Sequence, residues 1–173
     1  MPRQSIASVV AGGMLALVMA AAPIALQAQG NITVLKPAAM ERLMPATVFY
    51  RGKTATTELR NSGGVKFSDG YYVLASLVDT SGYSSAVANK YQAYFITEVP
   101  IHVGGMRLGA GAYGIGFIAG NKFVVTDVGG HDVLTADSAT DNSIKRPMPL
   151  QIIAETGGRF RLYAGRRYVV LSR

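Results

Sequence analysis

Cysteine and tryptophan are absent from this sequence of 173 residues, and histidine occurs only twice. Without cysteine the chain has no disulfide framework, no thiolate zinc site, no cysteine nucleophile and no lipidated-cysteine anchor. Charged residues make up only 16 % of the chain and hydrophobic residues 49 %, which argues against wholesale disorder. A chain of this length forms one ordinary domain, and it must rely on its hydrophobic core for stability.

The first 28 residues have the pattern of a secretory signal peptide. Arg3 supplies the positive charge near the start, and no charged residue occurs between Ile6 and Leu26. Ala28 ends the segment with a small residue, and we expect cleavage after it. An uncleaved N-terminal anchor is the alternative reading, because the apolar run is long enough to span a bilayer.

Cleavage would leave residues 29–173 as a single mature domain that does not span the membrane. An exported chain without cysteine suits a bacterial periplasm or cell surface better than a small eukaryotic secreted domain, which disulfides often cross-link. We therefore expect a periplasmic or secreted protein. The sequence does not indicate its oligomeric state.

The excess of positive charge is confined to the end of the chain. The whole chain has 17 Lys and Arg residues against 10 Asp and Glu residues. Residues 29–141 hold nine of each sign, whereas residues 142–173 hold seven basic residues and only Glu155 as an acid. This asymmetry indicates either an anion-binding surface or a charged edge hairpin that discourages aggregation between sheets.

Short runs of β-branched and aromatic residues, separated by turn residues, recur over residues 46–172. They predict an all-β fold, an antiparallel barrel or sandwich of about eight to ten short strands. Pro37 and Pro45 enclose a segment that predicts a helix of about two turns. Residues 85–90 can add one further helical turn.

Two groups of turn residues lead to expectations about strand pairing. The sequence Asn-Ser-Gly-Gly at residues 61–64 predicts a turn that separates two strands. Gly120 and Asn121 lie between apolar runs and predict a two-residue hairpin turn. In a hairpin with that turn, Phe117 would face Val124.

The C-terminal hairpin carries the most distinctive candidate binding surface. With Gly165 and Arg166 as its turn, Leu162 pairs with Val169 on its apolar face. The opposite face and the turn region bring arginine beside tyrosine: Arg159, Arg161, Tyr163, Arg167 and Tyr168. Such side chains bind carboxylates, phosphates or sulfated sugars through forked hydrogen bonds and ring stacking. The expected partner is an anionic small molecule or an envelope glycan or lipid, and nucleic acid is not expected.

Residues 109–114 read Gly-Ala-Gly-Ala-Tyr-Gly, which matches the dinucleotide-binding pattern of glycines. That motif requires a helix after the glycines, whereas a strand pattern and a turn follow here, so no dinucleotide or other cofactor is expected. Gly114 and Gly116 lie on one face of the predicted strand, where two missing side chains open a groove. A ligand, an aromatic ring or another strand can fill it, so both glycines are candidate ligand contacts.

Both histidines lie near carboxylates in the sequence, His102 after Glu98 and His131 between Asp127 and Asp132. These five side chains are weak candidates for acid–base catalysis. Their spacing matches no metal-binding motif, so no metal is expected. The sequence Gly-Gly-His-Asp can also form a plain turn, with Asp132 bonded to local backbone.

The leading hypothesis is an exported, non-catalytic β module that binds an anionic ligand near the C-terminal hairpin. A small periplasmic enzyme that uses His131 with Asp127 or Asp132 is the first alternative. No common catalytic signature supports an enzyme. The second alternative is a structural or assembly protein of the cell envelope that acts through an exposed edge strand.

Overall fold

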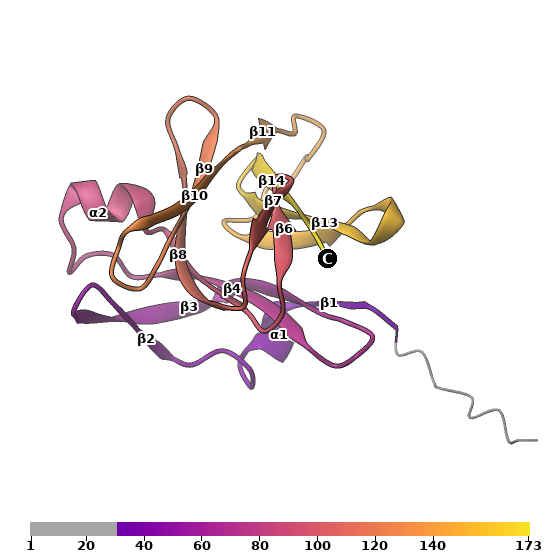
Figure 1. Cartoon of the computed structure of the whole chain (residues 1–173), viewed down its shortest axis with the longest axis horizontal. Helices are drawn as coiled ribbons and strands as arrows, with labels where there is room; N and C mark the ends of the chain where they lie inside the picture. Colours follow the sequence, from indigo (N-terminus) through magenta and orange to yellow (C-terminus); the bar gives the residue numbers. More distant parts are fainter. Residues whose placement is uncertain (1–30) are drawn as a thin grey trace, which may run out of the picture.

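A computed structural model describes residues 31–173, and in this range the protein consists of two antiparallel sheets (Figure 1). The predicted all-β class is confirmed. Fourteen strands are present, against the eight to ten expected, because several have only two to four residues. The predicted signal peptide, residues 1–28, lies outside the described residues.

The first sheet has eight strands. They are β1 (Thr33–Leu35), β2 (Thr47–Tyr50), β3 (Lys53–Lys66), β4 (Tyr72–Val78), β5 (Ala93–Thr97), β8 (Gly111–Ile118), β9 (Lys122–Thr126) and β10 (Asp132–Asp137). Their order is β1-β3-β4-β5-β8-β9-β10, and β2 pairs with β3. Neighbouring strands in this order are mostly consecutive along the chain, as short turns require.

The second sheet has six strands. They are β6 (Ile101–Val103), β7 (Met106–Leu108), β11 (Ala139–Thr140), β12 (Gln151–Ala154), β13 (Arg159–Ala164) and β14 (Arg167–Ser172). Their order is β12-β13-β14-β6-β7, and β11 also pairs with β14. Among the described strands no hydrogen-bonded ladder joins the two sheets, so the fold is a sandwich and not a closed barrel.

The first sheet is buried on both of its faces. Val73 and Ala75 on β4 point into the core between the two sheets, where they join Leu162 of β13. Leu74, between them, points to the opposite face and into an outer core. This double burial explains the nearly continuous apolar sequence of β4.

Three short elements cover the outer core: β2, α1 (Pro37–Met40) and α2 (Ser85–Lys90). In Figure 1, β2 and α1 lie near β3, and α2 lies beside β8 and β9. The one-turn helix expected at residues 85–90 is therefore present. No helix within residues 31–173 is long and apolar enough to cross a membrane.

The helix between Pro37 and Pro45 is shorter than predicted. α1 has only four residues, and the chain continues to Met44 in hydrogen-bonded turns. Met40 and Met44 are both buried in the outer core. A segment this short makes too few helical bonds to offset nucleation, so the burial of the two methionines determines its path.

β3 continues without interruption through residues 61–64, so the predicted turn there is wrong. A bulge between Glu58 and Ser62 absorbs the irregular sequence and bends the strand. At Gly64 an added Cβ would lie 2.7 Å from the carbonyl oxygen of Val73. The glycine marks close backbone approach within a strand rather than the end of one.

The two predicted hairpins have different outcomes. In β13–β14, Leu162 pairs with Val169 as expected. In β8–β9, Phe117 pairs with Phe123, not with Val124. The β8–β9 loop has three residues rather than two, and this difference shifts the register by one position.

Candidate functional site

The arginine–tyrosine face of the C-terminal hairpin is present, but its central arginine is already paired inside the protein. Arg161 forms ion pairs with Glu155 and with Asp141, whose Oδ2 lies 3.5 Å from Nη1. Its guanidinium lies 4.4 Å from the centre of the Tyr168 ring. Tyr163 is buried and donates a hydrogen bond of 2.9 Å to Asp141.

These contacts fasten the polar segment 141–149 to the hairpin. Hydrogen bonds from the hydroxyl and the backbone N–H of Ser143, and then from Tyr163, lower the pKa of Asp141. Arg166 donates to the carbonyl oxygens of Asn142 and Ile144. The positive charge of this hairpin therefore has a structural role, because Arg161 and Arg166 both bind groups within the chain.

The remaining two arginines of the predicted face differ in exposure. Arg167 donates to the carbonyl oxygen of Phe117 at 2.9 Å and lies over that ring, 5.3 Å from its centre. Arg159 makes a longer contact with Glu155, 3.7 Å from Nε to Oε2, and its side chain is 55 % exposed. Arg159 is thus the arginine of this face that remains most open to a ligand.

Protein atoms fill the groove that Gly114 and Gly116 were expected to open. A Cβ added at Gly114 would lie 2.6 Å from the Tyr50 ring and 2.9 Å from the Tyr91 ring. A Cβ at Gly116 would lie 2.5 Å from the carbonyl oxygen of Lys90 at the end of α2. The two missing side chains thus admit two aromatic rings and the backbone of a helix.

The five acid–base candidates do not form one site. Glu98 accepts a hydrogen bond of 2.8 Å from the backbone N–H of Tyr72. His102 lies exposed on β6 in the second sheet. Asp132 forms an ion pair with Lys90, 2.7 Å between Nζ and Oδ2. Within residues 31–173, no group of three or more metal-ligating side chains is arranged to hold a metal ion.

His131 and Asp127 do pair, but on an exposed loop. The ring Nδ1 of His131 lies 3.1 Å from Asp127 Oδ2, and the His131 side chain is 84 % exposed. Asp127 also accepts the backbone N–H of His131 at 2.9 Å, which is the largest cause of its lowered pKa. The loop is therefore a turn braced by Asp127, and not by Asp132 as expected.

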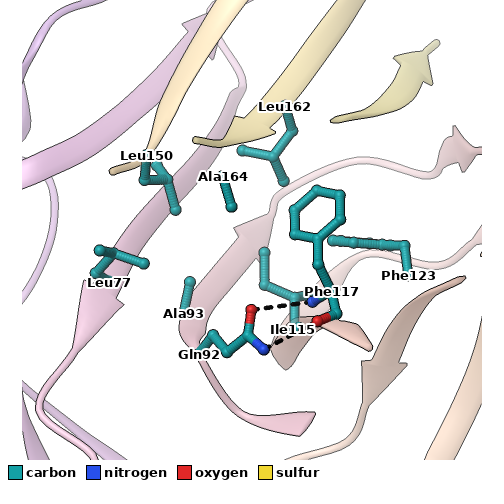
Figure 2. A pocket seen from close by; sticks show the side chains of 10 residues that line it. Leu77, Gln92, Ala93, Ile115, Phe117, Phe123, Leu150, Leu162 and Ala164 are labelled. Atoms are coloured by element: carbon teal, nitrogen blue, oxygen red, sulfur yellow. Dashed lines mark hydrogen bonds between the residues drawn. The ribbon is translucent and has the colours of Figure 1, made fainter. Parts of the chain in front are cut away.

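The centre of the space between the two sheets is filled, although a hollow of about 200 Å³ remains at one edge, lined by residues of β1, β3 and β12 such as Leu35, Gly63 and Ile152. A smaller hollow of about 10 Å³ lies between the sheets, and Figure 2 shows the apolar side chains that line it, among them Leu77, Ile115 and Leu162. Gln92 closes one side, because its amide donates to the carbonyl oxygen of Phe117 and accepts from that residue's N–H. A hollow of this size has room for one water and not for a ligand.

A larger hollow lies on the surface beside the β2–β3 turn. It has a volume of about 300 Å³ and is lined by Arg51, Lys53, Tyr83, Ser84 and Val87. We call it the basic groove. Neither Arg51 nor Lys53 forms an ion pair within residues 31–173, in contrast to Arg161. The groove therefore presents two positive charges that no carboxylate of the described chain neutralises.

The turn holds Arg51 in a conformation that arginine seldom adopts. Arg51 has a φ of 48° and Gly52 a φ of 78°, and Tyr50 pairs with Lys53 across the turn. Two-residue hairpins of this kind favour Asn or Asp at the first position, because a left-handed conformation strains most other side chains. The backbone N–H of Arg51 donates to the carbonyl oxygen of Val128 at 2.8 Å, which anchors the turn.

Tyr83 forms a fixed wall of the basic groove. Its hydroxyl donates to the carbonyl oxygen of Tyr50 at 3.0 Å, and the carbonyl oxygen of Lys53 lies within hydrogen-bond distance of the same hydroxyl, at 3.3 Å. Its ring makes T-shaped contacts with the rings of Tyr50 and Tyr91, with centroid distances of 6.1 and 5.4 Å. Because the hydroxyl is occupied, the ring is the part of Tyr83 that a ligand can meet.

Comparison of this chain with protein families, with curated proteins and with solved structures finds no match. The sequence and the geometry of the described residues thus carry the functional argument. None of the candidate binding residues predicted from the sequence lies in the basic groove. An arginine at the first position of a tight turn was the available signal, but the second half of the groove lies about thirty residues away, at Tyr83.

Proposed function

We propose that this protein is an exported, non-catalytic binding module that recognises an anionic ligand at the basic groove. The observation that carries the proposal is the pair of cations, Arg51 and Lys53, that line a hollow without a carboxylate partner in residues 31–173. Two cations on one side of a hollow attract an anion and can bind it with charge-assisted hydrogen bonds. Export rests on the signal-like sequence of residues 1–28.

The proposed ligand is still an anion, as predicted from the sequence, but the proposed site is the basic groove and not the C-terminal hairpin. On the C-terminal hairpin, Arg161 would have to exchange Glu155 and Asp141 for a ligand. In the basic groove an anion meets cations that make no such exchange. The groove is therefore the better anion site of the two.

The conformation of Arg51 allows a test that separates binding from folding. Arg51→Asn places a preferred residue at the first position of the turn, so we expect the thermal midpoint to stay the same or to rise. The same variant loses one of the two cations. We expect its affinity for inorganic phosphate, citrate or oligogalacturonate at low salt to fall about tenfold.

Arg146→Asn is the matched control, because it removes the same charge from an exposed residue outside the groove. Titration calorimetry of the mature chain with the three anions would measure both variants. An equal loss of anion affinity in the two variants would show that binding depends only on net charge. It would overturn the assignment of the site to the basic groove. No measurable binding of any of the three anions to the unaltered protein would overturn the proposed function.

A further inference from the structure

We propose that the ligand of the basic groove is an acidic saccharide, whose carboxylate is bound by Arg51 and Lys53 while its ring lies on Tyr83. This inference rests on the proposed function and narrows its ligand class. Three features of the groove carry it: the distance between cation and ring, the orientation of Tyr83 and the unused hydroxyl of Ser84.

The cation and the ring are placed to act on one ligand. Lys53 Nζ lies 6.0 Å from the centre of the Tyr83 ring and donates to the carbonyl oxygen of Gly82 at 2.8 Å. An anion bound to Lys53 therefore lies beside the face of the ring. An inorganic anion would leave this apolar surface exposed to water, whereas a carboxylate attached to a sugar ring covers it.

Tyr83 presents the ring in a fixed orientation. Its hydroxyl bonds to backbone carbonyl oxygens, and its ring makes T-shaped contacts with Tyr50 and Tyr91. A rigid aromatic wall loses little conformational entropy when a ligand stacks on it. Val87 extends the apolar surface at the same hollow.

Ser84 supplies a hydroxyl that the fold does not use. It occupies the N-cap position of α2 but makes no capping hydrogen bond with its side chain. The hydroxyl oxygen of an N-cap serine ordinarily accepts a hydrogen bond from a backbone N–H in the first turn of the helix. Here it makes no such bond and lies on the exposed rim of the groove. Hydrogen bonds to the hydroxyls of a sugar require a small polar group at such a position.

The experiment compares D-galacturonate with D-galactose, inorganic phosphate and benzoate by calorimetry on the mature chain at low salt. We expect galacturonate to bind about tenfold more tightly than each of the other three, because galactose lacks the carboxylate, phosphate lacks the sugar ring and benzoate lacks the hydroxyls that Ser84 would bind. Equal affinity for galacturonate and phosphate would overturn the acidic-saccharide proposal and leave the proposed anion-binding function intact. Tighter binding of benzoate would overturn it in favour of an aromatic acid.

Substitutions of Tyr83 test whether its ring causes the preference for galacturonate over phosphate. Tyr83→Leu should weaken galacturonate binding about tenfold and leave phosphate binding nearly unchanged, since it removes the ring and keeps both cations. Tyr83→Phe is the matched control and should retain the preference for galacturonate. A preference that survives Tyr83→Leu would overturn the role of the ring.

Ser84→Ala provides a readout that does not depend on Tyr83, whose loss can affect folding. Ser84 makes no capping bond, so the thermal midpoint should change little. Galacturonate binding should weaken about threefold, with phosphate binding unchanged. Equal binding of galacturonate to Ser84→Ala and to the unaltered protein would show that Ser84 does not contact the ligand and would overturn the proposed role of its hydroxyl.

Discussion

Tyr50 and Tyr91 stack with their ring centroids 3.8 Å apart, yet only one of the two hydroxyls has a partner. The Tyr50 hydroxyl lies 2.7 Å from Thr126 Oγ1, whereas the Tyr91 hydroxyl has no hydrogen-bond partner among the described residues. Burial, followed by the neighbouring tyrosines, raises the pKa of Tyr91, so its ring carries no charge at neutral pH. The stack thus combines favourable ring packing with one unsatisfied polar atom.

Tyr91→Phe should leave stability unchanged or raise it by about 1 kcal/mol, because it removes a buried hydroxyl that has no partner. Tyr50→Phe is the matched control and should lower stability by about 1 kcal/mol, because it leaves Thr126 without that contact. Urea unfolding of the two variants measures both changes. A larger loss for Tyr91→Phe than for Tyr50→Phe would reveal a partner for the Tyr91 hydroxyl.

Gly116→Ala should lower the free energy of unfolding by about 2 to 3 kcal/mol. The new Cβ would lie 2.5 Å from the carbonyl oxygen of Lys90, so α2 would have to move away from β8. Gly82→Ala is the control, because a Cβ there would meet nothing within 4 Å. Chemical unfolding compares the two, and a harmless Gly116→Ala would contradict the close packing of α2 on β8.

Stability should fall at acid pH partly because Asp141 becomes protonated. Its folded-state pKa is lowered, chiefly by the Ser143 hydroxyl, so its contribution is present above the pKa of the unfolded state, about 4, and is lost as pH falls below it. Asp69, Asp79 and Asp127 also have lowered pKa values and contribute to the same slope. We therefore expect Asp141→Asn to reduce the slope without abolishing it.

Ser143→Ala should give a slope between those of the unaltered protein and Asp141→Asn, because it removes only the hydroxyl bond to Asp141. Thermal midpoints measured from pH 6 down to about pH 3 test both variants. Identical profiles for all three proteins would show that Asp141 does not hold segment 141–149 to the hairpin.

Two arginines of the C-terminal hairpin should respond differently to substitution. Arg161→Gln leaves Asp141 without its guanidinium partner and Glu155 with only the longer contact from Arg159, so stability should fall by about 1 kcal/mol. Arg159→Gln alters an exposed side chain, so stability should change little. Thermal or urea unfolding measures both.

Arg159→Gln also tests the hairpin as a ligand site, because it leaves both ion pairs of Arg161 in place. If the basic groove binds the anion, retention of this variant on an anionic matrix at low salt should match that of Arg146→Asn, which carries the same change in charge. A clearly larger loss for Arg159→Gln would restore the hairpin face as the recognition surface.

Some local features of the chain are readable from the sequence, whereas the course of β3 through residues 61–64 and the register of β8 and β9 are not. The alternation of apolar residues and the turn at Gly165 and Arg166 predict β13 and β14 with the register Leu162–Val169, which the structure has. Turn residues and side-chain alternation act over a few positions, so a single sequence reveals them. The all-β class follows from the repetition of such segments.

The tertiary structure decided which charged side chains lack an ion-pair partner among the described residues. The reason is that residues far apart in the sequence can form an ion pair once the chain is folded. Arg161 meets Asp141 twenty residues away, so one of the arginines predicted to bind a ligand makes an internal contact instead. Arg51 and Lys53 meet Tyr83 only because α2 and the β2–β3 turn pack on the same side of the first sheet. Composition determined that an uncross-linked core must hold the fold together, but only the packing of α2 and the β2–β3 turn on the outer face of the first sheet determined where that fold leaves positive charge open to a ligand.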